Sequence, residues 1–285
     1  MNRPANIITI LILVALITYL FAQAPTPLPE QEDVSGELIP IETVFKLVAA
    51  ENNVVRALWT RDIVGMGKKS GLKFDEDWRD NGAQAGPLPA LFLREAATSL
   101  EKNVIRLSLF LGSDFPINPS NLFLGQQKVA FEKIKSNHLP QFFYAQDTKL
   151  YTAMFPDYSS VQPCVSCHNK HPDSPKTDWV LDDVMGATTW SYPNEVVNRD
   201  EIIKIIASLR KGFRDAYTAY IEKAATFSKK PKIGTRWPKD GYFLPSADTF
   251  MNEFSKRASQ SSIELLLLKP ASAGKNEAKV KKNAE

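Results

Sequence analysis

The stretch CVSCHNKHPDSPKTDW, Cys164 to Trp179, holds both cysteines and two of the three histidines of the 285-residue chain. Its first five residues form the pattern Cys-x-x-Cys-His, which is the attachment signal for c-type haem. In this chemistry both thiols bond covalently to the haem, and the adjacent histidine binds the iron from one side. The pattern therefore predicts one haem c, held by Cys164 and Cys167, with His168 as an axial iron ligand.

Two other uses of paired cysteines fit the sequence less well. A disulfide or a redox pair needs no adjacent histidine, and the thioredoxin-like motif normally lies in a βαβ unit, which this sequence does not show. A structural zinc site needs a second close pair of ligands, and the chain has only two cysteines. Haem attachment is therefore the favoured interpretation.

The N-terminal segment predicts export. Arg3 is the only charged side chain before Glu30, and the run Ile7 to Ala22 between them is apolar or weakly polar. The length of this run lies between that of a signal-peptide core and that of a membrane-spanning helix. Both alternatives place the rest of the chain outside the cytoplasm.

The cleavage site decides between these alternatives. Ala22-Gln23-Ala24 has the small-x-small form of a signal-peptidase site, but Pro25 follows it directly and should hinder the peptidase. We therefore expect an uncleaved membrane anchor, with a cleaved signal peptide as the alternative.

The remaining sequence predicts an α+β fold that begins and ends with helices. Apolar residues recur at helical spacing over Ile39–Val64, Ala90–Lys102 and Asn121–Ser136. Strand patterns cover 105–111 and 182–192, and 141–145 with 149–155 form a hairpin. A long helix follows, with Asn194 as its predicted N-cap, and a short helix lies around 248–257.

These elements divide the chain into five segments. The predicted boundaries are 1–24 for the signal anchor or signal peptide, 25–38 for a Pro-rich linker, 39–193 for the haem domain, 194–258 for a helical extension packed against it, and 259–285 for a flexible basic tail.

Cys164 to Trp179 resembles a family of bacterial single-haem-c domains with a PAS-like fold. In that family a C-x-x-C-H-N-x-H-P-x-S-P-K-x-D-W block precedes a strand that opens near G-D-V-x-G. The block matches at all of its fixed positions, whereas the strand has Leu181-Asp182-Asp183-Val184 where glycine usually precedes the aspartate. The resemblance covers roughly Ile39 to Tyr192, most strongly in its last thirty residues.

This resemblance implies a PAS-like antiparallel sheet with flanking helices. Members of the family occur alone or as the extracytoplasmic sensor part of histidine kinases and nucleotide cyclases, so it also implies redox or gas sensing. For this chain it places the domain on the periplasmic side of a bacterial inner membrane, anchored by the N-terminal segment, or soluble in the periplasm if that segment is cleaved.

The sequence offers more than one candidate for the ligand on the second face of the iron. Met154 is the first candidate, because it lies on the strand entering the haem loop and its thioether is soft enough to bind iron; core packing is the alternative. His138, near the same hairpin, is the second candidate, with a solvent-exposed position as the alternative. In some relatives an upstream cysteine binds here, but this chain has no third cysteine.

Two residues of the block are candidates for contacts around the haem. His171 lies three residues after His168 on the same side of the haem, so we expect it to contact a propionate or to support the iron ligand through a hydrogen bond. Lys176 is a candidate for neutralising a propionate, and a solvent-facing position is its equal alternative.

Two classes of function follow. In the first, the haem's redox state or a bound diatomic gas changes the domain, and the flanking helices pass the change to a separate partner protein. In the second, the protein is a monohaem electron-transfer cytochrome or a subunit of a respiratory complex. No phosphate loop, nucleophile elbow or carboxylate pair indicates an enzyme, so peroxidase or nitrogen-oxide chemistry is a weaker third option. The net charge of +3, with lysines gathered in the tail, does not indicate nucleic-acid binding.

Overall fold

The computed structural model describes residues 12–19 and 38–267, with side chains up to residue 259. Residues 12–19 are helical, and they belong to a unit separate from the compact unit that starts at Leu38. Within the described ranges, no helix combines the length and the apolar character needed to cross a membrane. The predicted anchor lies partly outside these ranges, and so does the linker 25–38 apart from Leu38.

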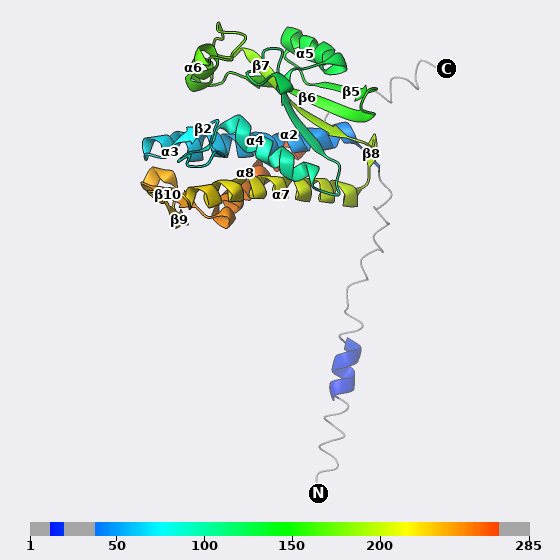
Figure 1. The fold of residues 1–285 in the computed structure, drawn as a ribbon. Coiled ribbons are helices and arrows are strands. Elements are labelled where there is room, and N and C mark those ends of the chain that lie inside the picture. The colour runs from blue at the N-terminus through cyan, green and yellow to red at the C-terminus, as the bar shows by residue number, and fades with distance from the viewer. Residues whose placement is uncertain (1–11, 20–37, 268–285) are drawn as a thin grey trace, which may run out of the picture. The chain divides into compact units, whose positions relative to one another are not determined.

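The second unit is a mixed α+β fold in which a four-stranded antiparallel sheet lies on a layer of helices (Figure 1). The strand order is β4-β7-β6-β5. These strands are β4 (Ser108–Gly112), β5 (Gln141–Ala145), β6 (Leu150–Tyr158) and β7 (Val184–Tyr192). The helical layer contains α2 (Ile41–Ala57), α3 (Met66–Lys69), α4 (Pro89–Glu101), α7 (Arg199–Ala224) and α8 (Ala247–Leu267).

Short elements complete the unit. They are a π-helix (Leu58–Gly65) that joins α2 to α3, 3-10 turns at Pro119–Asn121 and Pro238–Asp240, and the strand pairs β1 (Ile39–Pro40) with β8 (Val196–Val197), β2 (Phe74–Asp75) with β3 (Gly86–Pro87), and β9 (Lys232–Gly234) with β10 (Phe243–Pro245). The helix predicted over Ile39–Val64 therefore continues without a break to Lys69.

The main hydrophobic core lies between the sheet and the helical layer. It is rich in aromatic pairs: Trp59 stacks on Phe92 at 4.4 Å between ring centroids, and Tyr217 stacks on Phe250 at 4.0 Å. Such pairs add about 0.5–1.5 kcal/mol each to the gain from burial. Because α7 and α8 supply Tyr217 and Phe250, the segment 194–258 shares one core with the rest of the unit.

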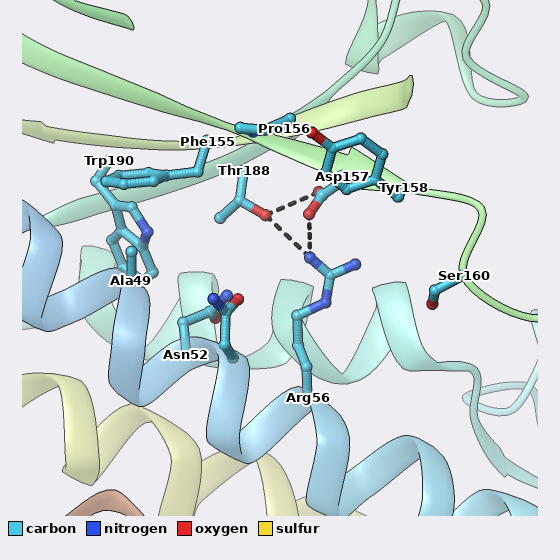
Figure 2. Close-up of a pocket in the computed structure, with 11 residues that line it drawn as sticks. Ala49, Asn52, Arg56, Phe155, Pro156, Asp157, Tyr158, Ser160, Thr188 and Trp190 are labelled. Atoms are coloured by element: carbon cyan, nitrogen blue, oxygen red, sulfur yellow. Dashed lines mark hydrogen bonds and ion pairs between the residues drawn. The ribbon is translucent and has the colours of Figure 1, made fainter. Parts of the chain in front are cut away.

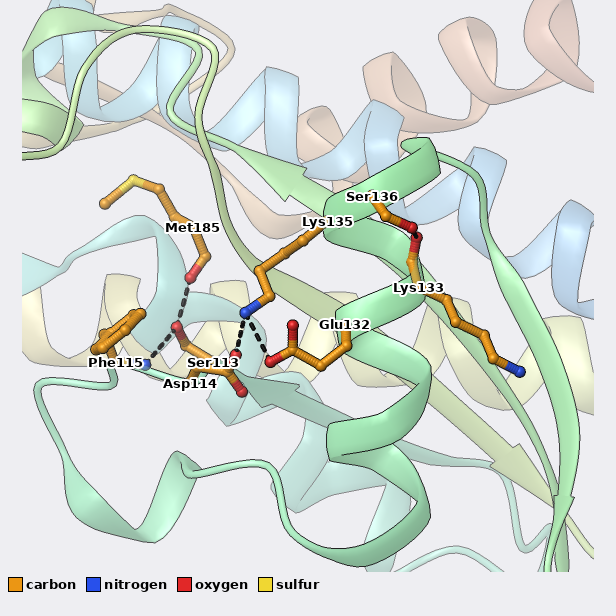
Figure 3. Close-up of polar contacts among 8 residues, drawn as sticks. All are labelled: Ser113, Asp114, Phe115, Glu132, Lys133, Lys135, Ser136 and Met185. Atoms are coloured by element: carbon orange, nitrogen blue, oxygen red, sulfur yellow. Dashed lines mark hydrogen bonds and ion pairs between the residues drawn. The ribbon is translucent and has the colours of Figure 1, made fainter.

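A second, smaller core lies on the other face of the sheet, under α5 (Gly125–Asn137). Figure 3 shows the polar contacts that fix α5 there: Lys135 pairs with Asp114 at 2.6 Å and with Glu132 at 2.8 Å. Ser113, next to Asp114, donates to the backbone carbonyl of Met185 on β7 at 2.5 Å. Both faces of the sheet are therefore covered.

Because side chains alternate along a strand, β6 divides its residues between the two cores. Ala153 lies in the main core, whereas Met154 lies in the second core. Phe155 pairs with Thr188 on the neighbouring strand β7. Its side chain faces the helices, as that of Ala153 does. The predicted hairpin is confirmed, since β5 pairs with β6 in antiparallel register.

The prediction that Asn194 caps the long helix is wrong. The cap is Asn198, whose side chain accepts a hydrogen bond from the backbone N–H of Glu201 at 2.9 Å. The chain stays extended up to this point because Val196 and Val197 pair with Pro40 and Ile39. At the other end α8 runs to Leu267, so the first part of the predicted tail is helical, and residues 268–285 lie outside the described ranges.

Candidate haem-attachment site

The cysteine motif forms the helix α6 (Gln162–Lys170), which starts with a proline in its first turn and follows the end of β6. Both thiols are free; Cys164 is half-buried and Cys167 is exposed. His168 is four residues after Cys164, so these two side chains lie on the same face of the helix. The helix thus presents two thiols and one imidazole within about one turn.

The environment of Cys164 does not suit a redox thiol. Burial raises the pKa of this thiol, and the Val161 backbone and the Arg56 charge offset the rise only in part. A catalytic cysteine needs a lowered pKa, because the thiolate is the nucleophile. At neutral pH Cys164 is therefore protonated and a poor nucleophile for disulfide exchange.

The environment of His168 suits a metal ligand. Burial lowers its pKa, and the nearby His171 lowers it further. The ring is therefore neutral at pH 7, which is the form that binds metal ions. Its Nδ1 is buried and has no hydrogen-bond partner among the described residues. Leaving such an atom unpaired costs about 1–3 kcal/mol, so this ring nitrogen is free to take a partner that the described residues do not supply.

Asn169, the next residue, closes the loop that follows the helix. Its side-chain oxygen accepts from the backbone N–H of Trp179, and its amide nitrogen donates to the Trp179 carbonyl, both at 2.9 Å. Ser159 ties the far side of the loop by donating to the carbonyl of Val180 at 2.6 Å. The loop that contains the block residues between His171 and Trp179 is thus joined to α6 at Asn169 and to the end of β6 at Ser159.

Replacing Asn169 with alanine is expected to destabilise the folded protein by about 2 kcal/mol, because two hydrogen bonds of about 1 kcal/mol each are lost. Urea unfolding of the full chain measures this change, and limited proteolysis should show faster cleavage between residues 170 and 178. N169D is the matched control, since it keeps the acceptor for the Trp179 N–H and should lose less. Equal stability of N169A and wild type would contradict the role assigned to this amide.

His171 and Lys176 are both engaged within the protein. Nε2 of His171 lies 3.1 Å from both carboxylate oxygens of Glu76, and its Nδ1 accepts from the backbone N–H of Asp173 at 3.1 Å. The ring proton of a neutral His171 therefore lies on Nε2 and points at Glu76. Lys176 pairs with Asp178 and lies 4.7 Å from the centre of the Trp179 ring. His171 therefore joins the loop between α6 and β7 to Glu76, whereas Lys176 makes its contacts within that loop.

A cavity of about 370 Å³ lies between α2 and the strands β6 and β7 (Figure 2). This volume is within the range of small-molecule and cofactor sites. The α2 residues on its wall recur at helical spacing, and the sheet contributes residues from the end of β6 and the middle of β7. The lining residues are Ala49, Asn52, Asn53, Arg56, Phe155, Pro156, Asp157, Tyr158, Ser160, Thr188 and Trp190.

One end of this cavity is charged and lies beside α6. Arg56 forms an ion pair with Asp157 and donates to the hydroxyl of Thr188 at 3.2 Å, and this hydroxyl donates to Asp157 at 2.8 Å (Figure 2). Ser160, two residues before α6 begins at Gln162, also lines the cavity. The start of α6 is therefore close to the cavity.

The two candidates for the second iron ligand lie outside the cavity wall. Met154 is fully buried in the second core, on the sheet face away from α2. His138 is exposed at the C-terminus of α5, where it has φ 60°, and its ring stacks on Tyr158 with centroids 6.0 Å apart. Tyr158 lines the cavity, so the ring of His138 stacks on a residue of the cavity wall. No group of three His, Cys, Asp or Glu side chains in the described ranges is arranged to hold a metal ion.

Sequence reasoning missed the cavity residues Asn52 and Arg56. Asn52 offers the only early signal, because it interrupts the apolar stripe of its helix between Val48 and Val55 and yet is 1% exposed. A polar side chain in that stripe indicates a polar partner or a site.

The fold and the site define a mixed α+β domain that carries a Cys-x-x-Cys-His helix next to a polar cavity. Residues 38–193 match the model of the Tll0287-like family, which is more than half of the chain, and the protein belongs to this family. The matched region includes the whole sheet, α6 and every residue of the cavity, and it ends before α7. No curated protein and no solved structure gave a significant match.

Proposed function

We propose that this is an exported c-type haem protein whose PAS-like domain senses redox state or a diatomic gas. Cys164 and Cys167 attach one haem, and His168 binds its iron from one side. The haem supplies an iron atom that can change oxidation state and bind a gas. The observation that carries the proposal is the buried, unpartnered ring nitrogen of His168, on the same helix as two free thiols and beside a cavity.

The protein's own residues support a route from the cavity to the distant helices. One side of α2 lines the cavity through Asn52 and Arg56. Glu51, between Ala50 and Asn52 on the same helix, is bound by Arg210 of α7 through Nε at 3.0 and 3.2 Å. A shift of α2 at the cavity therefore moves a side chain to which α7 is bound. We propose that this shift reaches a separate partner protein, at a membrane to which the N-terminal segment anchors the chain.

The test is to produce the full chain together with c-haem maturation machinery and to examine it after purification. We expect the mass of the denatured protein to exceed that of the polypeptide by one haem, with the optical spectrum of a c-type haem. The reduced protein is then exposed to carbon monoxide. A shift of the haem bands supports gas sensing, unmoved bands support redox sensing, and the absence of covalent haem would refute the proposal.

Electron transfer is the second candidate, and the exposure of Cys167 favours it. A haem bonded to an exposed thiol would be within reach of a redox partner that approaches from solvent. Two results together would favour this function over sensing. The reduction potential of the haem would stay fixed, and α7 and α8 would have the same structure in the oxidised and reduced states.

A further inference from the structure

Arg56 has one edge of its guanidinium group free in the cavity between α2 and the sheet. Its hydrogen bonds to Asp157 and Thr188 are both donated by the same nitrogen, Nη1. Nε and Nη2 make no hydrogen bond within the described part of the chain, and neither is among the buried polar atoms that lack a partner. Both nitrogens are therefore accessible, and the side chain as a whole is 33% exposed.

This free edge suits a carboxylate group. The N–H groups on Nε and Nη2 of an arginine point the same way, so they can donate two parallel hydrogen bonds to the two oxygens of one carboxylate. Figure 2 shows this edge on the side of Arg56 that is turned away from Asp157 and towards Ser160, which also lines the cavity. A carboxylate bound there lies on the Ser160 side of the guanidinium group.

The charges around Arg56 favour a carboxylate over a group with two negative charges, such as a phosphate. Asp157 already compensates part of the positive charge of Arg56, and its second carboxylate oxygen accepts from the hydroxyl of Thr188. Among the described residues, no other lysine, arginine or histidine lines the cavity. A dianion would therefore bring an uncompensated charge into the cavity, which is costly.

The rest of the cavity suits an apolar body attached to the carboxylate. Its wall away from Arg56 includes Ala49 and Phe155 (Figure 2). The volume of about 370 Å³ lies near the lower end of the range for small-molecule sites, so the body that enters is small. Asn53 and Ser160 line the cavity and are exposed, so a ligand can enter from solvent.

We infer that the free edge of Arg56 binds a carboxylate group in this cavity. Two sources carry this group: a small apolar acid from the surroundings, and a propionate of the attached haem. The first source needs no haem and goes beyond the proposed function, whereas the second rests on it. From either source the carboxylate acts on α2, the helix whose Glu51 is bound by Arg210.

The test titrates benzoate into the full chain produced without haem, followed by calorimetry, with benzamide as the uncharged analogue of the same size. The variant R56L/D157N removes both charges, so neither is left unpaired. D157N keeps Arg56 and removes its internal partner. K46L is the matched control, because Lys46 is an exposed cation on the same helix that does not line the cavity.

We expect wild type to bind benzoate about tenfold more tightly than benzamide, the equivalent of about 1.4 kcal/mol, since hydrogen bonds to charged groups have values of this order. R56L/D157N should lose this preference, and K46L should keep it. D157N should bind benzoate about threefold more tightly than wild type, because a partly exposed like charge beside the ligand is removed. Circular dichroism of each variant checks that its fold is unchanged.

The same titration of the chain carrying covalent haem separates the two sources. Unchanged benzoate binding assigns the site to a free acid. Loss of benzoate binding, together with a haem reduction potential that shifts in R56L/D157N and not in K46L, assigns it to a propionate. If the haem blocks benzoate and R56L/D157N has the wild-type potential, Arg56 has no carboxylate ligand in the complete protein and the inference is wrong.

The inference is also wrong if the haem-free wild type binds benzoate no more tightly than benzamide, or if R56L/D157N keeps the preference for benzoate. These titrations use no haem, so their failure leaves the proposed haem function standing. A chain that attaches no haem refutes the proposed function instead, and it removes only the propionate as a source of the carboxylate.

Discussion

Replacing both Cys164 and Cys167 with serine is expected to abolish covalent haem attachment and to leave the fold intact. A serine hydroxyl cannot form the thioether bond, so no haem should remain on the denatured chain. The fold should persist because neither thiol forms a disulfide bond, and Cys167 is exposed. We expect the free energy of unfolding without haem to change by less than about 1 kcal/mol.

The measurement is the mass of the denatured protein after co-production with c-haem maturation machinery, together with circular dichroism of the native protein. S166A is the matched control, because Ser166 lies between the two cysteines on α6 but occupies a variable position of the motif. It should carry one haem, as wild type does. Haem retained by the denatured double-serine variant would show that attachment does not depend on these thiols.

The cluster of two thiols and one imidazole could be predicted because its residues are adjacent in the sequence. Cys164, Cys167 and His168 lie on one short helix, so their spacing alone brings them together. The hairpin of β5 and β6 was predictable for a related reason, since its strands follow each other closely around Gln146-Asp147-Thr148. Local sequence decides both features.

The cavity could not be predicted, because its walls come from segments more than a hundred residues apart. Arg56 meets Asp157 across 101 positions of sequence, and Thr188 across 132. The start of α7 was misplaced for the same reason: β8 is held extended by β1, at the other end of the domain. Pairing of this kind depends on the tertiary fold and leaves no signal in the local pattern.

The position of Met154 shows a third kind of limit. Strand alternation places Met154 and Phe155 on opposite faces of β6, but both faces are covered, by α5 on one side and by the helical layer on the other. Because both faces are apolar, the sequence does not reveal which one adjoins the cavity. Only the tertiary structure places Phe155 on the cavity wall and Met154 in the second core.

Replacing Arg210 with alanine is expected to lower the free energy of unfolding by about 3 kcal/mol. Arg210 binds both carboxylate oxygens of Glu51, whose side chain is 2% exposed. Removing one partner of a buried ion pair leaves an uncompensated charge, which costs about 3–5 kcal/mol. We expect the lower end of this range, because the side chain of Arg210 is 36% exposed and water can enter the space it leaves. The guanidinium also lies 5.8 Å from the centre of the Phe254 ring, so α8 loses a contact as well.

Urea unfolding of the full chain at pH 7 measures this loss, and K211A is the matched control. Lys211 is the next residue on α7 and pairs with Asp215. The Lys211 side chain is 61% exposed and that of Asp215 is 39% exposed, so removing this ion pair should cost less than about 1 kcal/mol. The double variant E51L/R210L should recover much of the loss, because apolar residues can replace a buried pair without a desolvation penalty. If R210A were no less stable than K211A, the Glu51–Arg210 pair would not join α2 to α7, and the route proposed from the cavity to the distant helices would lose its main contact.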